Sequence, residues 1–308
     1  MNGMTRSGPA GFGICLLSVL LITVASGAAM LDQGSAGSCV LIQEAAEEKP
    51  LLERGDCAVR LSPASTFKIP HALVALELGV VTTTSVERWD GVRHDQQAEW
   101  NHDHTVISAL RPSVLWFFQR IAPRIGAERM TTWLERFDYG NREVSGLITE
   151  YWINGRLRVS PREQVQFLRR FYRDQLPVAP ASMRAVRQGL EQKPGTVQNA
   201  LGVHQMKGDW RQATLNAKTG ATTAAGLRVS WLVGELRSSG REYVFAAAVW
   251  RGGGNVDSLD GARLAVDAFV TAGILPRPTL FASPRAGSVL RGLSGSRSSS
   301  RHFPESIF

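Results

Sequence analysis

The stretch Ser65-Thr66-Phe67-Lys68 follows an apolar, proline-marked approach and leads into an apolar helix candidate that runs to Gly79. If the stretch opens that helix, Ser65 and Lys68 share one face, with β-carbons about 5–6 Å apart. A serine hydroxyl needs a nearby base to act as a nucleophile. A lysine in an apolar pocket loses hydration, which favours the neutral amine that can serve as that base. The two residues are therefore a candidate nucleophile and base.

Ser-x-x-Lys alone is a weak signal, because ordinary usage of the two residues produces it about once in a chain of this length. A helix with Ser65 as its N-cap and a solvated Lys68 has the same pattern without any chemistry. The rest of the chain must decide between the two interpretations.

The amino terminus of the 308-residue chain has the organisation of an export signal. Arg6 precedes an apolar run over residues 12–24, and small residues follow over 25–29. This order is typical of a secretory signal peptide over residues 1–29, cleaved close to Ala28 or Ala29. The run is short and interrupted by glycine, so a retained membrane anchor is the less favoured interpretation. We expect a protein secreted into the periplasm, without a stable membrane anchor.

Two cysteines remain after removal of that segment. Cys39 and Cys57 flank two short strand candidates, 40–43 and 51–53. In an oxidising compartment such a pair can close a disulfide across the hairpin. Two small buried residues with reduced thiols fit the pattern equally well.

The hydrophobic period changes along the chain from strands to helices and back. Helical patterns cover the middle, and Ser160-Pro161-Arg162-Glu163 is a helix start with a capping serine, a proline at the first helical position and a glutamate three residues after the cap. Strand patterns follow at 213–218, 227–235 and 243–249. A last helix begins at Ser258 or Asp260 and stops at Gly273. Strands at both ends predict one sheet assembled from distant segments, with an inserted helical lobe, which is a mixed α+β fold.

The net charge of +8 is the excess of 35 basic residues over 27 acidic ones, and the basic residues are scattered, with several of them in residues 277–308. That segment is rich in Ser, Arg and Gly with few apolar positions, which predicts a disordered tail. The body, residues 30–276, is long enough for one large catalytic domain or two closely joined lobes. It has no basic block interleaved with aromatics, so we expect no nucleic-acid partner. His102 and His104 lack a second ligand cluster, so we expect a solvated loop there and no metal.

Four motifs stand in order along the chain: Ser65-Thr66-Phe67-Lys68, Ser113-Val114-Leu115, Tyr139-Gly140-Asn141 and Lys218-Thr219-Gly220. This set resembles the class D serine β-lactamases, the oxacillinases. The resemblance extends from Cys39 to about Pro276 and includes Trp152 and the stretch Trp231-Leu232-Val233-Gly234. It implies a penicillin-recognising fold, an antiparallel sheet with flanking helices beside a helical lobe, and a site between them.

The resemblance also implies a role for each matched residue. Ser65 would attack the β-lactam carbonyl and become acylated. Lys68 would be carboxylated by carbon dioxide or bicarbonate, with no separate cofactor, and act as general base for Ser65 and for the deacylating water. Trp152 would hydrogen-bond that carbamate, and Ser113 would pass a proton to the leaving nitrogen. The residues implied in substrate binding are Lys218, Thr219, Gly220, Ala221 and, by a looser alignment, Arg263. The backbone N–H groups of Ser65 and Ala221 would form the oxyanion hole.

Acyl transfer needs an activated hydroxyl, a proton donor to the leaving group and fixed donors at the developing oxyanion, and turnover also requires a group that activates water after acylation. The class A pattern uses a separate glutamate, and neither its Ser-Asp-Asn element nor a matching glutamate loop is present. A carbamate on Lys68 would fill that gap. Leu115 departs from the valine usual in the family, beside the lysine pocket, and can alter how water and carbon dioxide reach Lys68. The basic tail is a second departure.

We expect a small-molecule β-lactam as substrate, penicillins by default, and a monomer or homodimer. Two other interpretations share the acylation chemistry. A penicillin-sensing receptor domain acylates and stays acylated, but such receptors carry membrane spans and an effector region that this sequence does not offer. A transpeptidase or carboxypeptidase acts on peptidoglycan, and Tyr139-Gly140-Asn141 with the compact length favours the lactamase. A purely structural interpretation leaves the polar motif residues unexplained.

Overall fold

The computed structural model describes residues 1, 3 and 35–277. The chain separates into two units, Met1–Asp32 and Gln33–Phe308, and the fold belongs to the second. The predicted signal peptide lies almost entirely outside the described residues, as does the tail after residue 277, so both stay predictions.

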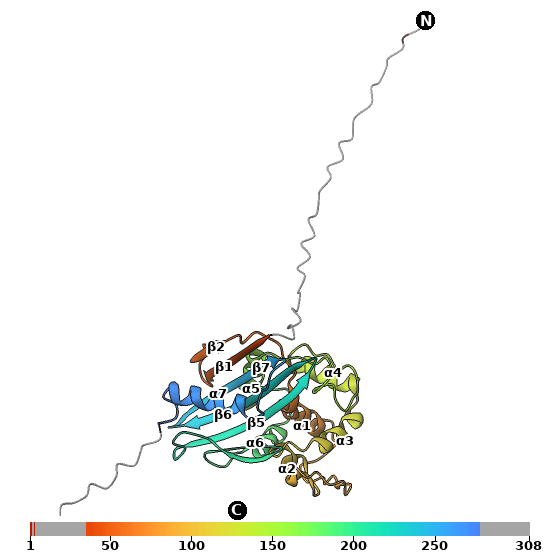
Figure 1. Cartoon of the computed structure of the whole chain (residues 1–308). Helices are drawn as coiled ribbons and strands as arrows, with labels where there is room; N and C mark the ends of the chain where they lie inside the picture. The colour runs from red at the N-terminus through yellow and green to blue at the C-terminus, as the bar shows by residue number, and fades with distance from the viewer. Residues whose placement is uncertain (2, 4–34, 278–308) are drawn as a thin grey trace, which may run out of the picture. The chain divides into compact units, whose positions relative to one another are not determined.

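The centre of the fold is a five-stranded antiparallel sheet in the order β2-β1-β7-β6-β5 (Figure 1). Its strands are β1 (Ala36–Glu44), β2 (Leu52–Gly55), β5 (Ala213–Ala224), β6 (Leu227–Ser238) and β7 (Arg241–Gly252). β1 pairs with β7 along its whole length, which joins the two ends of the domain in one sheet. The prediction of one sheet built from distant segments is therefore confirmed. β5 forms an edge of this sheet.

Seven α-helices accompany the sheet in the described part of the chain. They are α1 (Lys68–Glu77), α2 (Val106–Leu110), α3 (Leu115–Ile125), α4 (Ala127–Arg136), α5 (Pro161–Tyr172), α6 (Pro180–Leu190) and α7 (Asp260–Thr271). α7 lies on one face of the sheet and α5 on the other (Figure 1). Alternate residues of β5 (Ala213, Leu215 and Ala217) join apolar residues of α7 in one core, as the two-residue period of a strand requires. The other helices between β2 and β5, which exclude α5, form the inserted helical lobe.

The start of α5 follows the sequence prediction in atomic detail. The Ser160 hydroxyl accepts a hydrogen bond from the Glu163 backbone N–H at 3.2 Å, and the Glu163 carboxylate accepts one from the Ser160 N–H at 2.8 Å. This reciprocal capping box satisfies two N–H groups that the first helical turn would otherwise leave unpaired.

Three local features differ from expectation. Ser65 lies in a 3-10 turn, η1 (Ala64–Phe67), and α1 begins only at Lys68. A proline inside a helix is expected to end or kink it, but Pro123 lies in the last turn of α3, which continues to Ile125. A small second sheet of β3 (Thr196–Asn199) and β4 (Gly202–Gln205) was not predicted, because four-residue strands carry too little alternation to be recognised.

The structure joins Cys39 and Cys57 in a disulfide, with their Cα atoms 5.1 Å apart. The sequence left two interpretations open, a disulfide or two buried reduced thiols, and the structure has the disulfide. The bond ties β1 to the segment that follows β2 and leads towards Ser65.

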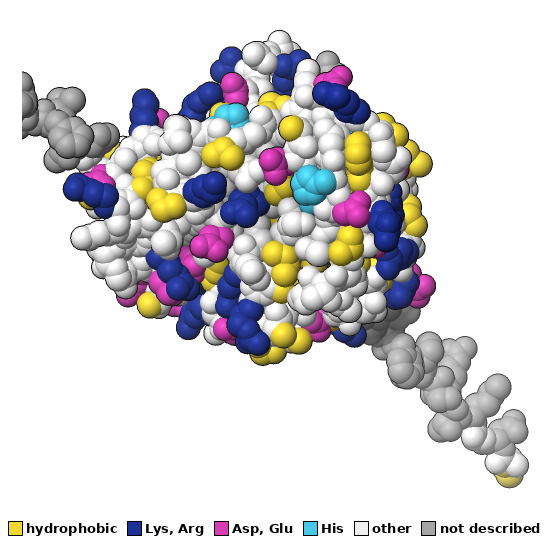
Figure 2. Space-filling model, turned by 90° about the horizontal axis from the view of Figure 1, so that it is seen from below, with side chains coloured by type: hydrophobic (Ala, Val, Ile, Leu, Met, Phe, Trp, Pro, Cys, Tyr) yellow, Lys and Arg dark blue, Asp and Glu magenta, His cyan; other side chains and the backbone are white. Residues whose placement is uncertain are grey.

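No helix within residues 35–277 has the length and apolar character that crossing a membrane requires. On the face drawn in Figure 2, basic side chains lie among acidic ones. Several arginines are paired with carboxylates, among them Arg60 with Glu163 and Arg162 with Glu53. Pairing of this kind places carboxylates beside basic side chains and so offsets part of the positive charge.

Gly140→Ala is expected to destabilise the fold by about 2 kcal/mol or more. Gly140 has a φ of +55°, and an added Cβ would lie 2.1 Å from the Arg158 carbonyl oxygen. Gly79→Ala is the matched control, because Gly79 has a φ of +62° but open space around its Cα. Urea unfolding followed by circular dichroism measures both losses. Equal losses would contradict the close backbone approach at Gly140.

Candidate active site

Ser65 and Lys68 are in direct contact at the start of α1. The Lys68 Nζ donates a hydrogen bond to the Ser65 Oγ at 2.8 Å. Lys68 is fully buried, whereas Ser65 is partly exposed. The structure therefore has a buried lysine in place of the solvated one that the N-cap interpretation requires. Ala64 adopts a φ of +49°, a conformation that non-glycine residues rarely take, immediately before the serine.

The electrostatics of this contact are dominated by burial. Burial lowers the pKa of Lys68 from 10.5 to about 7. Lys218 is also fully buried, and burial followed by the charge of Lys68 holds its pKa well below the ordinary value. No acidic side chain in residues 35–277 contributes to either shift. Two buried ammonium groups would repel each other, so the site favours a neutral amine or an added anion.

Trp152 supplies an unused hydrogen-bond donor near the lysine. Its side chain is fully buried and stacks on Phe67, the residue before Lys68, with ring centroids 6.0 Å apart. Its indole Nε1 has no hydrogen-bond partner. A buried N–H without an acceptor costs about 1–3 kcal/mol. An acceptor on Lys68 would satisfy it, so these residues fit a carboxylated lysine.

A pocket of about 200 Å³ opens beside Ser65. It is lined by residues from η1, the turn before α3, the β3–β4 turn, β5 and the loop before α7: Ser65, Ser113, Asn199, Ala200, Leu201, Thr219, Gly220, Ala221 and Ser258. The pocket thus brings Ser65 and Ser113 together with the Lys218-Thr219-Gly220 strand. Ser113 has a φ of +61° and is buried, with 5% of its surface exposed.

Gly220 allows the edge strand to approach the serine turn. A Cβ at this position would lie 3.0 Å from the Thr66 Cγ2 and 3.1 Å from the Pro63 carbonyl oxygen. These distances are tighter than ordinary van der Waals contacts, so a larger residue would push β5 away from η1. Glycine in this motif is therefore a requirement of packing at the site.

Ser62 links the sheet, the serine turn and the loop that carries Trp152. The Trp231 indole N–H donates to the Ser62 carbonyl oxygen at 3.0 Å. The Ser62 hydroxyl lies 3.1 Å from the Trp152 carbonyl oxygen and 3.0 Å from that of Ile153. Sequence reasoning missed Ser62, because a serine in a proline-marked loop carries no local signal for such a role.

The Tyr139-Gly140-Asn141 turn does not line the pocket and instead supports the loop behind it. The Asn141 amide donates to the Arg156 carbonyl at 2.8 Å, and its oxygen accepts from the Arg158 N–H at 2.8 Å. The next residue, Val159, pairs with Leu61 through two backbone hydrogen bonds of 2.9 Å. The motif therefore holds both the Trp152 loop and the approach to Ser65.

Two further predicted residues lie outside the pocket lining. Arg263 lies in α7 and pairs with Asp257 and Asp260, with its side chain half exposed. Leu115 begins α3 and is partly buried. The pocket lining includes four residues that were not predicted, Asn199, Ala200, Leu201 and Ser258. Gly202, just after Leu201, was the available turn signal.

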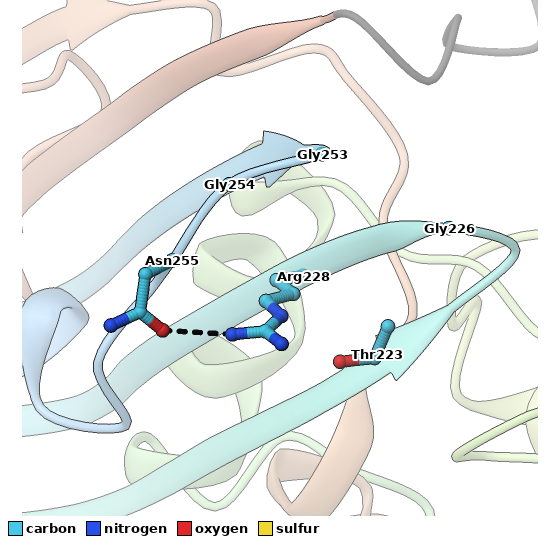
Figure 3. A pocket seen from close by; sticks show the side chains of 6 residues that line it. All are labelled: Thr223, Gly226, Arg228, Gly253, Gly254 and Asn255. Atoms are coloured by element: carbon cyan, nitrogen blue, oxygen red, sulfur yellow. Dashed lines mark hydrogen bonds between the residues drawn. The ribbon is translucent and has the colours of Figure 1, made fainter.

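A larger and more open hollow of about 430 Å³ lies where the β5–β6 hairpin meets the end of β7 (Figure 3). It is lined by Thr223, Gly226, Arg228, Gly253, Gly254 and Asn255. Arg228 donates to the Asn255 side-chain oxygen at 2.7 Å across it. None of the four motifs contributes to this hollow, so the candidate chemistry belongs to the smaller pocket.

The chain matches the family model of the penicillin binding protein transpeptidase domain over residues 33–267. It is 32% identical to β-lactamase OXA-9 of Klebsiella pneumoniae over 229 residues, which cover 70% of this chain and 80% of that protein. The solved structure of class D β-lactamase BAT-2 superposes with a TM-score of 0.65 at 29% identity, covering 78% and 92% of the two chains. The chain belongs to the class D β-lactamase family. The predicted fold is thereby confirmed.

The chain is also similar to a further β-lactamase and to a regulatory protein. β-Lactamase OXA-48 of Klebsiella pneumoniae is 38% identical over 185 residues, but the match spans only 60% of this chain and 64% of that protein, just under two thirds of its length. Regulatory protein BlaR1 of Bacillus licheniformis is 29% identical over 244 residues, 79% of this chain and 38% of that protein. The C-terminal domain of the BlaR penicillin-receptor superposes with a TM-score of 0.65 at 26% identity, covering 79% and 92% of the two chains. Proteins named as enzymes and as a receptor therefore share this fold.

In buffer free of carbon dioxide, Lys68→Met is expected to be more stable than the wild type at and below pH 7. The folded protein loses the Lys68 proton near pH 7, whereas the unfolded chain keeps it up to about 10.5. Within that window the unfolded state binds more protons, so wild-type stability rises with pH. The advantage of the variant should shrink by roughly 1.4 kcal/mol per pH unit. Urea unfolding between pH 6 and pH 10 measures it, and a constant difference from pH 7 upwards would show that burial does not neutralise Lys68.

Proposed function

We propose that this protein is a serine β-lactamase, which hydrolyses the amide bond of penicillins through an acyl-enzyme on Ser65 and so protects a cell from these antibiotics. The observation that carries the proposal is the 2.8 Å contact between the Ser65 Oγ and the Nζ of the fully buried Lys68. Family membership and the pocket shared with Ser113 and Thr219 support it.

In the proposed acylation, the Ser65 hydroxyl proton passes towards Lys68 while the Oγ bonds to the β-lactam carbonyl carbon. The backbone N–H groups of Ser65 and Ala221 are the proposed donors to the developing oxyanion, since both residues line the pocket. Breaking the carbon–nitrogen bond gives the ring nitrogen an electron pair, which takes the proton of the Ser113 hydroxyl. The Ser113 oxygen then takes up the proton that Ser65 had released towards Lys68. Water then attacks the ester carbonyl carbon and the bond from that carbon to the Ser65 Oγ breaks. One water proton goes to the Ser65 oxygen, the water oxygen stays on the penicillin as part of a carboxylate, and the second proton leaves to solvent.

We also propose that Lys68 is carboxylated. The neutral amine forms a carbon–nitrogen bond with carbon dioxide, one C=O electron pair moves to oxygen, and the amine proton leaves to solvent water. Bound there, the group would supply an anionic oxygen base for Ser65 and for the deacylating water. The unpaired Trp152 indole N–H would hold it, and a positively charged Lys218 would then face an anion instead of a second cation.

Substrate binding is assigned to the edge strand and its surroundings. Thr219 lines the pocket, and Lys218 lies buried behind it with its Nζ donating to the Thr219 carbonyl at 3.0 Å. We propose that both act on the substrate's carboxylate side. Arg263 would join them only by leaving Asp257 and Asp260, the carboxylates with which it is paired.

A penicillin-binding sensor or transpeptidase-like protein that acylates but turns over slowly is the second candidate. The likeness to BlaR1 and to the BlaR receptor domain favours it. The two candidates share every step up to the acyl-enzyme and differ only in its hydrolysis.

The proposed setting is the periplasm, reached through a signal peptide over residues 1–29, with the catalytic domain over 30–276. The Cys39–Cys57 disulfide supports an oxidising compartment, because such bonds are rare where thiols are kept reduced.

The purified mature protein, with penicillin in large excess, is expected to consume substrate continuously and faster when bicarbonate is added. The rate should fall reversibly when bicarbonate is removed, and also when the pH drops from 7 to 5, because protonation of Lys68 below its pKa of about 7 removes the neutral amine. Absorbance of the β-lactam ring follows the reaction. A single stoichiometric burst that then stops would support the sensor, and indifference to both bicarbonate and pH would count against the carbamate.

Two substitutions separate the nucleophile from the base. Ser65→Ala is expected to abolish covalent labelling by a fluorescent penicillin, because the attacking oxygen is lost. Lys68→Ala is expected to lower turnover by at least about a thousandfold, since both proton transfers lose their acceptor. Gel fluorescence and the ring-opening assay measure the two effects. Hydrolysis retained in Ser65→Ala would refute the assignment as a whole.

A further inference from the structure

His71 is a buried titratable residue that the proposed mechanism does not use. It lies on α1 three residues after Lys68, so both side chains lie on the same face of the helix. Its side chain is fully buried, and neither ring nitrogen has a hydrogen-bond partner. Buried polar groups in folded proteins are almost always paired, so an unpaired imidazole in the core requires an explanation.

The ring of His71 shares its surroundings with Lys68 and Trp152. Its centroid lies 5.4 Å from that of Phe118, and the Lys68 Nζ lies 5.5 Å from the same Phe118 ring. The His71 ring also meets the Trp152 ring edge to face, at 5.2 Å between centroids. The amine and the imidazole therefore both lie against Phe118, and the imidazole also lies against the Trp152 indole.

The imidazole in this position is neutral. Burial, and then the charge of Lys68, lower the pKa of His71 to about 3. A neutral imidazole has one N–H donor and one acceptor nitrogen. Together with the Trp152 Nε1, the site then contains two buried N–H donors without acceptors. A single anion with two oxygens, attached to Lys68, would provide an acceptor for each.

We propose that His71 is a positioning residue for carboxylated Lys68, with its ring N–H donating to one carbamate oxygen while the Trp152 indole N–H donates to the other. The inference rests on the proposed function, because it requires the carboxylation of Lys68. His71 does not touch the β-lactam; it acts by holding the base in place and by lowering the carbon dioxide concentration at which Lys68 is carboxylated. Carboxylation itself forms one carbon–nitrogen bond and releases one proton to solvent, and His71 stays neutral throughout.

The test is the carbamate signal in carbon-13 NMR, titrated with labelled bicarbonate in the wild type, His71→Phe and His71→Gln. His71→Phe keeps an aromatic ring in the core but removes the donor, whereas His71→Gln keeps an N–H. His71→Phe is expected to need about tenfold more bicarbonate for half-carboxylation, since a hydrogen bond to a charged group is lost, and His71→Gln less than that. Labelling of Ser65 by a fluorescent penicillin and the melting temperature show whether each variant is folded.

A second measurement does not depend on the folding of any His71 variant. In wild-type protein labelled with nitrogen-15 histidine, bicarbonate is expected to shift the ring N–H resonance of one of the six histidines. The same addition should shift no ring N–H in Lys68→Ala, which cannot be carboxylated.

The outcomes distinguish this inference from the proposed function. A wild-type protein without any carbamate signal would overturn the carboxylation and, with it, the inference. A wild-type carbamate together with equal half-carboxylation in folded His71→Phe, or with no histidine N–H shift, would overturn the role of His71 alone. The ring would then serve only to fill space between Phe118 and Trp152.

Discussion

The burial of the Lys68 amine against the Ser65 hydroxyl is the constraint on which the rest of the site depends. Removing an ammonium group from water is costly, and Lys218 adds a second buried amine to the same region. The fold tolerates this cost by lowering the pKa of Lys68 to about 7, so the amine can lose its proton near neutrality. The same shift that limits the cost of burial gives the amine the lone pair that proton transfer and carboxylation require.

Such a contact persists only if the surrounding backbone is fixed, and the fixing elements come from distant parts of the chain. The Ser62 carbonyl oxygen accepts a hydrogen bond from the Trp231 indole N–H of the sheet, and the Ser62 hydroxyl donates to the Trp152 carbonyl oxygen. The Gln164 side chain of α5 donates to the Thr66 hydroxyl at 2.8 Å. The Thr66 hydroxyl in turn donates to the Pro63 carbonyl at 2.7 Å, which closes the turn around Ser65. These bonds explain how Ala64 can keep its unfavourable positive φ value, because the surrounding contacts determine the turn.

The features that the sequence predicted well are those encoded by neighbouring residues. The capping box at Ser160 depends on side chains three positions apart, and the long strands β5, β6 and β7 carry enough apolar residues to be recognised. The β3–β4 turn escaped prediction because its residues become pocket lining only through tertiary packing. His71 escaped for a related reason: on an apolar helix face it is indistinguishable from a core residue until its neighbours and its unpaired nitrogens are known. The supporting role of Tyr139-Gly140-Asn141 likewise depends on Arg158, whose partner is set by the fold rather than by the local sequence.

Hydrolysis makes a stricter demand on this site than acylation does. Before acylation, the Lys68 Nζ lies 2.8 Å from the Ser65 Oγ, close enough for an unmodified neutral amine to take the hydroxyl proton. After acylation the Ser65 oxygen is an ester and has no proton to give, and the base must reach a water molecule instead. An amine that has just been protonated cannot do so, and its charge would again oppose that of Lys218. A carboxylated Lys68 meets both demands, since it extends the base beyond the Nζ and reverses the sign of the charge. The fold shared with a penicillin receptor is compatible with this proposal. In the proposed mechanism acylation would need only the serine and lysine, whereas turnover would also need an anion at Lys68, stabilised by the buried donors around it.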